Sequence, residues 1–234
     1  MSKQTPIASE RRSFLTRFPA GAASLAAVAL GGTALGQVKQ AAPTRWEPAR
    51  HDQDNWLDEL PGKHRLVFDT TGANSLGSAA LFANNYMLVN RTDYGLQNSD
   101  LAIVVVLRHQ STAFGFNDAM WAKYGAPIAT RSSFEDPKTK GAPKTNLFNA
   151  RDYGTQLPNW GTTLDALTSQ GVQFAICSVA TMGVASAISK ATGGNANTIN
   201  DELKANLIGN ARMVPAGIVA VSRAQERGYS LVAG

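Results

Sequence analysis

Cysteine is almost absent from this sequence. Its 234 residues include one cysteine, Cys177, and three histidines, His51, His64 and His109. A single cysteine cannot form a disulfide within the chain, which excludes a fold that depends on cross-links. The scattered histidines and the lone cysteine give none of the spacings of a zinc site, so the sequence predicts no bound metal.

Several motifs that mark enzymes and cofactor sites are also missing. The chain has no Gly-x-Ser-x-Gly elbow of a serine hydrolase. The glycine-containing stretch "TTGANSLGS" (70–78) lacks both the dinucleotide spacing G-x-G-x-x-G and the P-loop lysine. The acidic segment "HDQDNWLDE" (51–59) lacks the glycine and the spacing of a calcium loop. The identity of any cofactor therefore stays unknown.

The positive charge is concentrated at the amino terminus. Residues 1–36 carry Lys3, Arg11, Arg12 and Arg17 against Glu10. Without them Lys+Arg falls from 22 to 18 and Asp+Glu from 17 to 16, so a net charge of +5 becomes +2. No predicted element of the remainder carries a basic cluster, and we expect no nucleic-acid partner.

The first 36 residues have the composition of an export signal. The basic stretch "SERRSFLTRF" (9–18) precedes the Ala- and Gly-rich "PAGAASLAAVALGGTALG" (19–36). An apolar core of about 16 residues makes about 24 Å of helix, less than a hydrocarbon core of about 30 Å. We therefore expect a cleaved signal peptide, no membrane association after its removal, and a periplasmic location.

The Arg11-Arg12 pair followed by Phe14-Leu15 resembles a twin-arginine signal, although Glu10 and Thr16 depart from its usual pattern. A general secretory signal is the alternative.

Hydrophobic periodicity after residue 63 predicts an α/β domain over 63–234. Apolar runs predict strands, and segments with helical spacing alternate with them. Such alternation indicates βαβ units and a mainly parallel sheet that is covered on both faces. The expected strands are 64–70, 101–109, 172–177, 211–214 and 229–232; the expected helices are 75–90, 117–125, 162–171, 179–193, 198–208 and 215–228.

Two segments fall outside this alternation. Residues 37–62 predict an extended arm with one helical turn, on which Trp46 and Trp56 pack against the body or a neighbouring subunit. Residues 126–160 carry four prolines and no periodicity, and such long excursions are usually functional or contact a subunit. We expect a surface excursion anchored by aromatic side chains, with a lid or an oligomer arm as alternatives. The anchors are Phe134, Phe148, Tyr153 and Trp160.

Ligands of open parallel sheets bind beyond the carboxyl ends of the strands. Cys177 follows one predicted strand and begins a helix, where a partial positive charge and a neighbouring Arg108 would favour the thiolate. His109 is a candidate base or thiol partner. The alternatives are a buried, inert Cys177, a cysteine paired between chains, and a His109 that only bonds the backbone.

Anion binding is a further expectation at this edge. The residues placed to hold an anion with their side chains or backbone are Thr71, Asn74, Ser178 and Gly217.

Three segments together resemble the DsrE/DsrF-like family: "LAIVVVLRH" (101–109), "LTSQGVQFAICSVA" (167–180) and "ARMVPAGIVAVSRAQERGYSLV" (211–232). The resemblance implies a three-layer α/β/α domain with about five strands in a mainly parallel sheet, often in homo-oligomers. It also implies a link to sulfur metabolism. Cys177 matches the cysteine that carries a persulfide in members that relay sulfur.

We therefore expect an exported DsrE-like protein that binds or relays a small sulfur-containing or anionic species through Cys177, with Arg108 and His109 as helpers. The alternative is a non-catalytic ligand-binding or assembly module of the same fold with a buried structural cysteine. A redox enzyme with a bound cofactor is a third hypothesis that depends on the export route alone.

Overall fold

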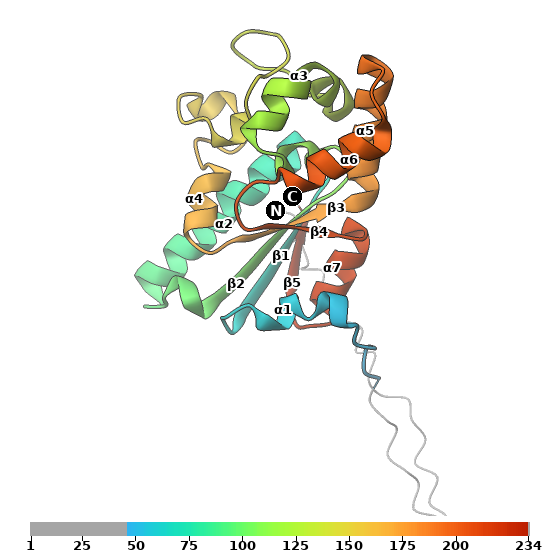
Figure 1. Ribbon diagram of the computed structural model, residues 1–234. Helices are drawn as coiled ribbons and strands as arrows, with labels where there is room; N and C mark the ends of the chain where they lie inside the picture. Colours follow the sequence, from blue (N-terminus) through green and yellow to red (C-terminus); the bar gives the residue numbers. More distant parts are fainter. Residues whose placement is uncertain (1–45, 234) are drawn as a thin grey trace, which may run out of the picture. The chain divides into compact units, whose positions relative to one another are not determined.

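The computed structural model describes residues 46–233, so the predicted signal peptide and the first part of the arm lie outside the described residues. A five-stranded parallel sheet lies between two helical layers (Figure 1). The predicted three-layer α/β/α architecture is confirmed. In sheet order the strands are β4 (Ala211–Val214), β3 (Gln173–Cys177), β2 (Leu101–Leu107), β1 (His64–Thr70) and β5 (Ser230–Ala233).

Strand β2 shows why the sheet is covered on both faces. All seven of its residues are buried, as a continuous β-branched run predicts. Alternate side chains point to opposite faces, so Ile103, Val105 and Leu107 join one hydrophobic cluster. Ala102, Val104 and Val106 join the other. The central strand therefore ties the two layers together.

Unequal helical layers cover the two faces. The larger layer contains α2 (Ala73–Asp93), α3 (Asp118–Ser132), α4 (Leu164–Ser169), α5 (Ser178–Thr192) and α6 (Ala196–Ala205). The smaller layer contains α1 (Trp56–Glu59) and α7 (Gly217–Gln225). The sequence places Pro215 at the first position of the last helix, whereas α7 begins two residues later. Short 3-10 helices span Asp52–Asp54, Asn98–Asp100, Ser111–Gly115, Leu147–Asn149 and Gly154–Gln156.

The described part of the arm packs on the smaller layer. Trp56 is buried in the cluster with α7, and the guanidinium of Arg212 lies 4.5 Å from its ring centroid. The Arg65 side chain and the Tyr229 hydroxyl both donate hydrogen bonds to the carbonyl of Leu57. The expectation that Trp56 anchors the arm is confirmed. Packing of Trp46 on the body or on a neighbouring subunit stays a prediction.

The predicted excursion starts later than the sequence indicates. Helix α3 continues to Ser132 with Pro127 inside it, so the expected boundary at residue 126 is wrong. The backbone is non-helical at Tyr124 (φ −127°), so α3 consists of two helical segments joined at a kink, and the first segment ends close to the predicted end at residue 125. Pro127 lies in the first turn of the second segment, where a proline is tolerated. Among the expected anchors, Phe148 is fully buried and packs against Phe114, but Trp160 is 64% exposed and anchors nothing.

Replacing Trp56 with alanine tests how far the arm belongs to the core. A buried Trp→Ala change costs about 3–5 kcal/mol, and we expect that loss in the free energy of unfolding measured by urea denaturation. Trp160→Ala, at a tryptophan that is 64% exposed, is the matched control and should change it by less than about 0.5 kcal/mol. Equal effects of the two changes would contradict a docked arm.

Candidate functional site

The strand order brings the predicted site residues to one edge of the sheet. β1, β2, β3 and β4 are neighbours and run parallel, so their carboxyl ends meet there. Leu107 pairs with Ile176, which places the segment after β2 beside the end of β3, as predicted. Strand alternation then divides these residues between the two faces of the sheet.

An ion pair occupies the edge on the α7 face. The Nε and Nη2 atoms of Arg108 donate hydrogen bonds of 2.7 and 2.8 Å to the two carboxylate oxygens of Asp69. The two side chains are 29% and 15% exposed, so the pair is largely shielded from water. This two-point contact fixes the guanidinium plane and neutralises its charge.

Gly217 is required by the close approach of α7 to this pair. A Cβ atom at Gly217 would lie 2.6 Å from the Cβ of Arg108 and 3.2 Å from a methyl group of Val106. Packing against Arg108 therefore accounts for a glycine at position 217, whose role in anion binding stays a prediction.

Cys177 is buried at the end of β3. Its exposed fraction is 6%, and its Sγ accepts a hydrogen bond of 3.4 Å from the backbone N–H of Ala180. The thiol therefore acts as the N-cap of α5. By strand alternation Cys177 follows Ala175 onto the α7 face, where Arg108 lies. The hydrogen bonds that Arg108 donates to Asp69 raise the pKa of the Arg108 guanidinium.

The other residues predicted to act with the thiol, His109 and Ser178, follow directly after Arg108 and Cys177 in the chain. His109 is exposed, has a left-handed backbone (φ 57°), and forms no side-chain hydrogen bond to another described residue. Ser178 is the first residue of α5 and is half-buried. The structure thus brings Cys177 beside Arg108, while neither His109 nor Ser178 has a contact that assigns it a role there.

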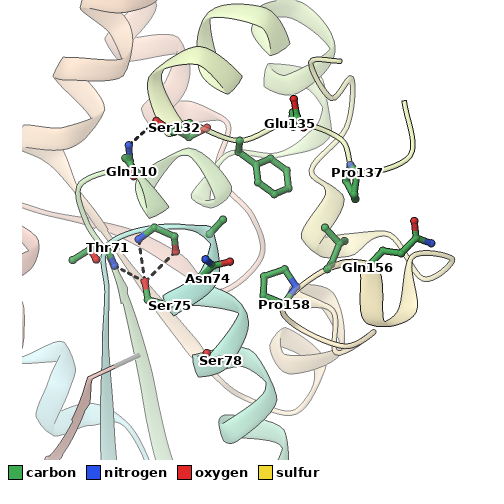
Figure 2. Close-up of a pocket in the computed structure, with 15 residues that line it drawn as sticks. Thr71, Asn74, Ser75, Ser78, Gln110, Ser132, Glu135, Pro137, Gln156 and Pro158 are labelled. Atoms are coloured by element: carbon green, nitrogen blue, oxygen red, sulfur yellow. Dashed lines mark hydrogen bonds between the residues drawn. The ribbon is translucent and has the colours of Figure 1, made fainter. Parts of the chain in front are cut away.

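A pocket lies beyond the same edge on the other face. Its volume is about 590 Å³, and it opens between the start of α2 and the excursion (Figure 2). Its walls carry hydroxyl and amide groups, and Glu135 is the charged residue among them. The lining residues are Thr71, Gly72, Ala73, Asn74, Ser75, Ser78, Gln110, Ser132, Ser133, Phe134, Glu135, Pro137, Gln156, Leu157 and Pro158.

The first turn of α2 forms the floor of this pocket. The Ser75 hydroxyl accepts hydrogen bonds from the backbone N–H groups of Thr71 (2.8 Å) and Gly72 (3.0 Å), as Figure 2 shows. Gly72, the N-cap residue, has no side chain to cap the helix. Within the described residues, no hydrogen bond engages the backbone N–H groups of residues 73–75. These N–H groups form the amino-terminal end of a long helix, where a hydrogen-bond acceptor is favoured.

The loop after β2 closes the pocket at a second side. Thr70 and Ser111 are buried, and the Thr70 hydroxyl donates a hydrogen bond of 3.0 Å to the Ser111 hydroxyl, which joins the end of β1 to the loop after β2. The Gln110 side chain then donates a hydrogen bond of 2.9 Å to the Ser133 hydroxyl at the end of α3. This contact joins the strand end to the start of the excursion (Figure 2).

The excursion supplies the remaining wall. Gly77 of α2 contacts Pro158 so closely that a Cβ there would lie 2.5 Å from the proline ring. Asp136 is buried and accepts hydrogen bonds from the Lys138 N–H (2.8 Å) and the Tyr153 hydroxyl (3.0 Å). The Lys138 bond stabilises the local turn, and the Tyr153 bond joins the two parts of the excursion that lie 17 residues apart in sequence.

Only part of the pocket was predictable. Thr71 and Asn74 were expected to bind a ligand and do line it, whereas Ser178 and Gly217 do not. Sequence reasoning missed the contributions of Ser75, Ser78, Ser132, Ser133 and Gln156. The signal that could have found several of them is the irregular excursion itself, which has the length typical of a functional loop.

Residues 46–233 contain no group of three His, Cys, Asp or Glu side chains that could hold a metal ion. No helix in that range is long and apolar enough to cross a membrane.

Comparisons with known proteins give little. No family model matches the chain, and no curated protein does. A solved structure described as a protein of unknown function, MTH1491 from Methanobacterium thermoautotrophicum, aligns at 16% identity with a TM-score of 0.36, covering 74% of this chain and 100% of that one. We infer nothing about function from a similarity this weak, and the resemblance to the DsrE/DsrF-like family stays a prediction beyond the shared parallel-sheet architecture.

The Asp136 contacts predict an acid-sensitive pocket wall. Burial alone would raise the pKa of Asp136, but its hydrogen bonds, led by the Lys138 N–H and the Tyr153 hydroxyl, lower it below the ordinary 3.8. A lowered folded-state pKa stabilises the fold above the ordinary value, and the stabilisation is lost as the pH falls through the folded value.

We therefore expect the free energy of unfolding of the wild type to fall below about pH 4 more steeply than that of Asp136→Asn. Asp201→Asn, an exposed carboxylate on α6, is the control and should retain the wild-type pH dependence. Identical acid profiles for the wild type and Asp136→Asn would contradict this assignment.

Proposed function

We propose that the protein is a binding module for a small polar ligand, held in the pocket between α2 and the excursion. The observation that carries the proposal is the cavity of about 590 Å³ at the carboxyl ends of β1 and β2, with its lining of hydroxyl and amide groups. That volume lies within the range of about 300–1,000 Å³ usual for small-molecule sites. The position is the one at which parallel sheets bind ligands.

The lining indicates the chemistry of the ligand. The unengaged N–H groups at the first turn of α2 are hydrogen-bond donors, and the helix end favours an anionic or strongly polar acceptor group. The side chains of Asn74, Gln110 and Gln156 provide both donors and acceptors for the rest of the molecule. A compact molecule with an acceptor group and several polar substituents fits this arrangement. The signal-like leader supports an exported protein that meets its ligand in the periplasm.

A thermal-unfolding screen against small polar and anionic compounds tests this function. A compound present at about 100 times its dissociation constant should stabilise the wild type by about 2.7 kcal/mol. Ser78→Phe fills the pocket from α2 and should abolish the shift. Ser186→Phe, a half-buried serine on α5, is the matched control and should keep it. A shift that survives Ser78→Phe would place the ligand elsewhere, and a screen without any shift would contradict the proposal.

The second candidate is the relay of a small sulfur species through Cys177. The observation that favours it is the position of the Cys177 thiol on the same sheet face as Arg108, with a helix N–H donated to its Sγ. Against it stand the burial of the thiol and the engagement of Arg108 by Asp69. A relay would need access to the sulfur atom, and these contacts restrict it.

Alkylation of Cys177 separates the two functions. With 6% of the residue exposed, the binding module predicts labelling of the native protein at least about tenfold slower than that of the unfolded chain, because only accessible thiolates react. The relay predicts fast native labelling and an added mass of about 32 Da after thiosulfate treatment, in which the Cys177 thiolate takes the outer sulfur of thiosulfate and sulfite leaves. That mass should be absent from Cys177→Ser.

A further inference from the structure

The ligand pocket between α2 and the excursion has no positively charged side chain in its wall. None of the described residues that line it is a lysine, an arginine or a histidine, and its one charged residue, Glu135, is negative. Arg108 and Lys138, which are near the lining in sequence, form ion pairs with aspartates. The Arg131 guanidinium lies beside Gly183 of α5. A phosphate, a sulfate or a polycarboxylate would therefore meet a carboxylate and no countercharge, although arginine or lysine usually binds such groups.

A hydrogen-bond acceptor lies beside the donors at the start of α2. The Oε1 atom of Gln110 would be 3.7 Å from a Cβ at Gly72, while its Nε2 donates to the Ser133 hydroxyl. The unengaged N–H groups of residues 73–75 can only donate, and Oε1 can only accept. A ligand hydroxyl satisfies both, because it accepts from an N–H group and donates to Oε1. An oxyanion can only accept, so Oε1 would repel it.

The free side chains on α2 have the same double character. The Asn74 amide and the Ser78 hydroxyl line the pocket and form no side-chain hydrogen bond to another described residue. In Figure 2 the Asn74 amide extends from α2 toward the excursion. An amide and a hydroxyl each donate and accept, so they pair with neutral hydroxyl groups without leaving a polar atom unmatched.

An aromatic ring supplies the apolar part of the wall. Phe134 lines the pocket and is half-buried, and its ring stands edge to face against Phe114 at a centroid distance of 5.0 Å. This contact holds the ring in place before any ligand enters. Pro158 adds a second apolar ring to the wall. A molecule with hydroxyl groups at its edges and a C–H face fits walls of both kinds.

We propose that the ligand is a neutral, polyhydroxylated ring of the carbohydrate class. This inference rests on the proposed function and specifies its ligand. One hydroxyl lies between the first turn of α2 and Gln110 Oε1, the adjacent hydroxyls bond to Asn74 and Ser78, and the C–H face packs against Phe134. A zwitterion such as an amino acid fits less well, because its carboxylate would face Oε1 and its ammonium would have only the exposed Glu135 as a partner.

Isothermal titration calorimetry of the full chain tests this ligand class. The probes are D-glucose, D-galactose, D-mannose, D-ribose and myo-inositol, compared with inorganic phosphate, sulfate and glycine. Calorimetry is preferred to thermal unfolding because concentrated sugars stabilise proteins without binding. At least one of the five polyols should bind saturably. Its dissociation constant should change by less than about twofold between about 0.05 M and about 0.5 M NaCl, since salt does not screen a neutral ligand.

Variants on α2 test the assigned contacts. Asn74→Leu removes an amide that bonds to no described residue, and it should raise the dissociation constant of that polyol about tenfold or more. Ser78→Ala should raise it about threefold or more, and alanine keeps the helix intact. Asn85→Leu is the matched control, because Asn85 is exposed on the same helix and does not line this pocket. Its affinity should equal that of the wild type.

The outcomes separate this inference from the proposed function. Saturable binding of phosphate, sulfate or glycine without binding of any polyol would overturn the carbohydrate class and leave the binding module standing. A polyol affinity that neither Asn74→Leu nor Ser78→Ala lowers, or that Asn85→Leu lowers equally, would also overturn it. If none of the eight probes binds, the carbohydrate class is overturned, and the wider screen described above then decides the proposed function.

Discussion

The parallel pairing of β1 with β2 is the constraint on which the rest of the structure depends. Its register runs from His64 with Leu101 to Thr70 with Leu107, so both strands end at the same level. The residues that follow are therefore neighbours, and alternation sends them to opposite faces. Asp69 and Arg108 form an ion pair beneath α7, while the backbone turns at Thr71 and Gln110 toward the larger helical layer.

The two faces of this edge have different chemistry for a physical reason. On the α7 face the helix approaches so closely that Gly217 is needed, and the guanidinium of Arg108 is held by Asp69. Little room or uncompensated charge is left for a substrate beside Cys177. On the other face the excursion contacts α2 where Pro158 lies against Gly77. Beside this contact a polar cavity lies between the excursion and the first turns of α2.

Much of this architecture could be predicted from local sequence patterns. The apolar run 101–107 and the alternating helices identified the parallel sheet, because burial on both faces leaves a continuous hydrophobic signature. The exposure of Cys177 could not be predicted, since it depends on how closely α7 approaches a neighbouring strand. The pocket was equally hidden, because residues far apart in sequence, such as Ser75, Gln110 and Gln156, meet only through the path of an aperiodic segment. The second segment of α3, from the kink at Tyr124 to Ser132, was missed because a proline in the first turn of a new helix also marks the end of the one before it.

The central claim is that the face of the sheet edge beside α2, and not the one beside Cys177, receives the ligand. Amide chemical shifts recorded during titration with a stabilising compound test it most directly. The account predicts that the largest changes fall on Ala73, Asn74 and Ser75, together with Gln110 and Ser133, while Cys177 and Gly217 stay unchanged. Changes centred on Cys177, Ala180 and Gly217, with the first turn of α2 unaffected, would contradict it.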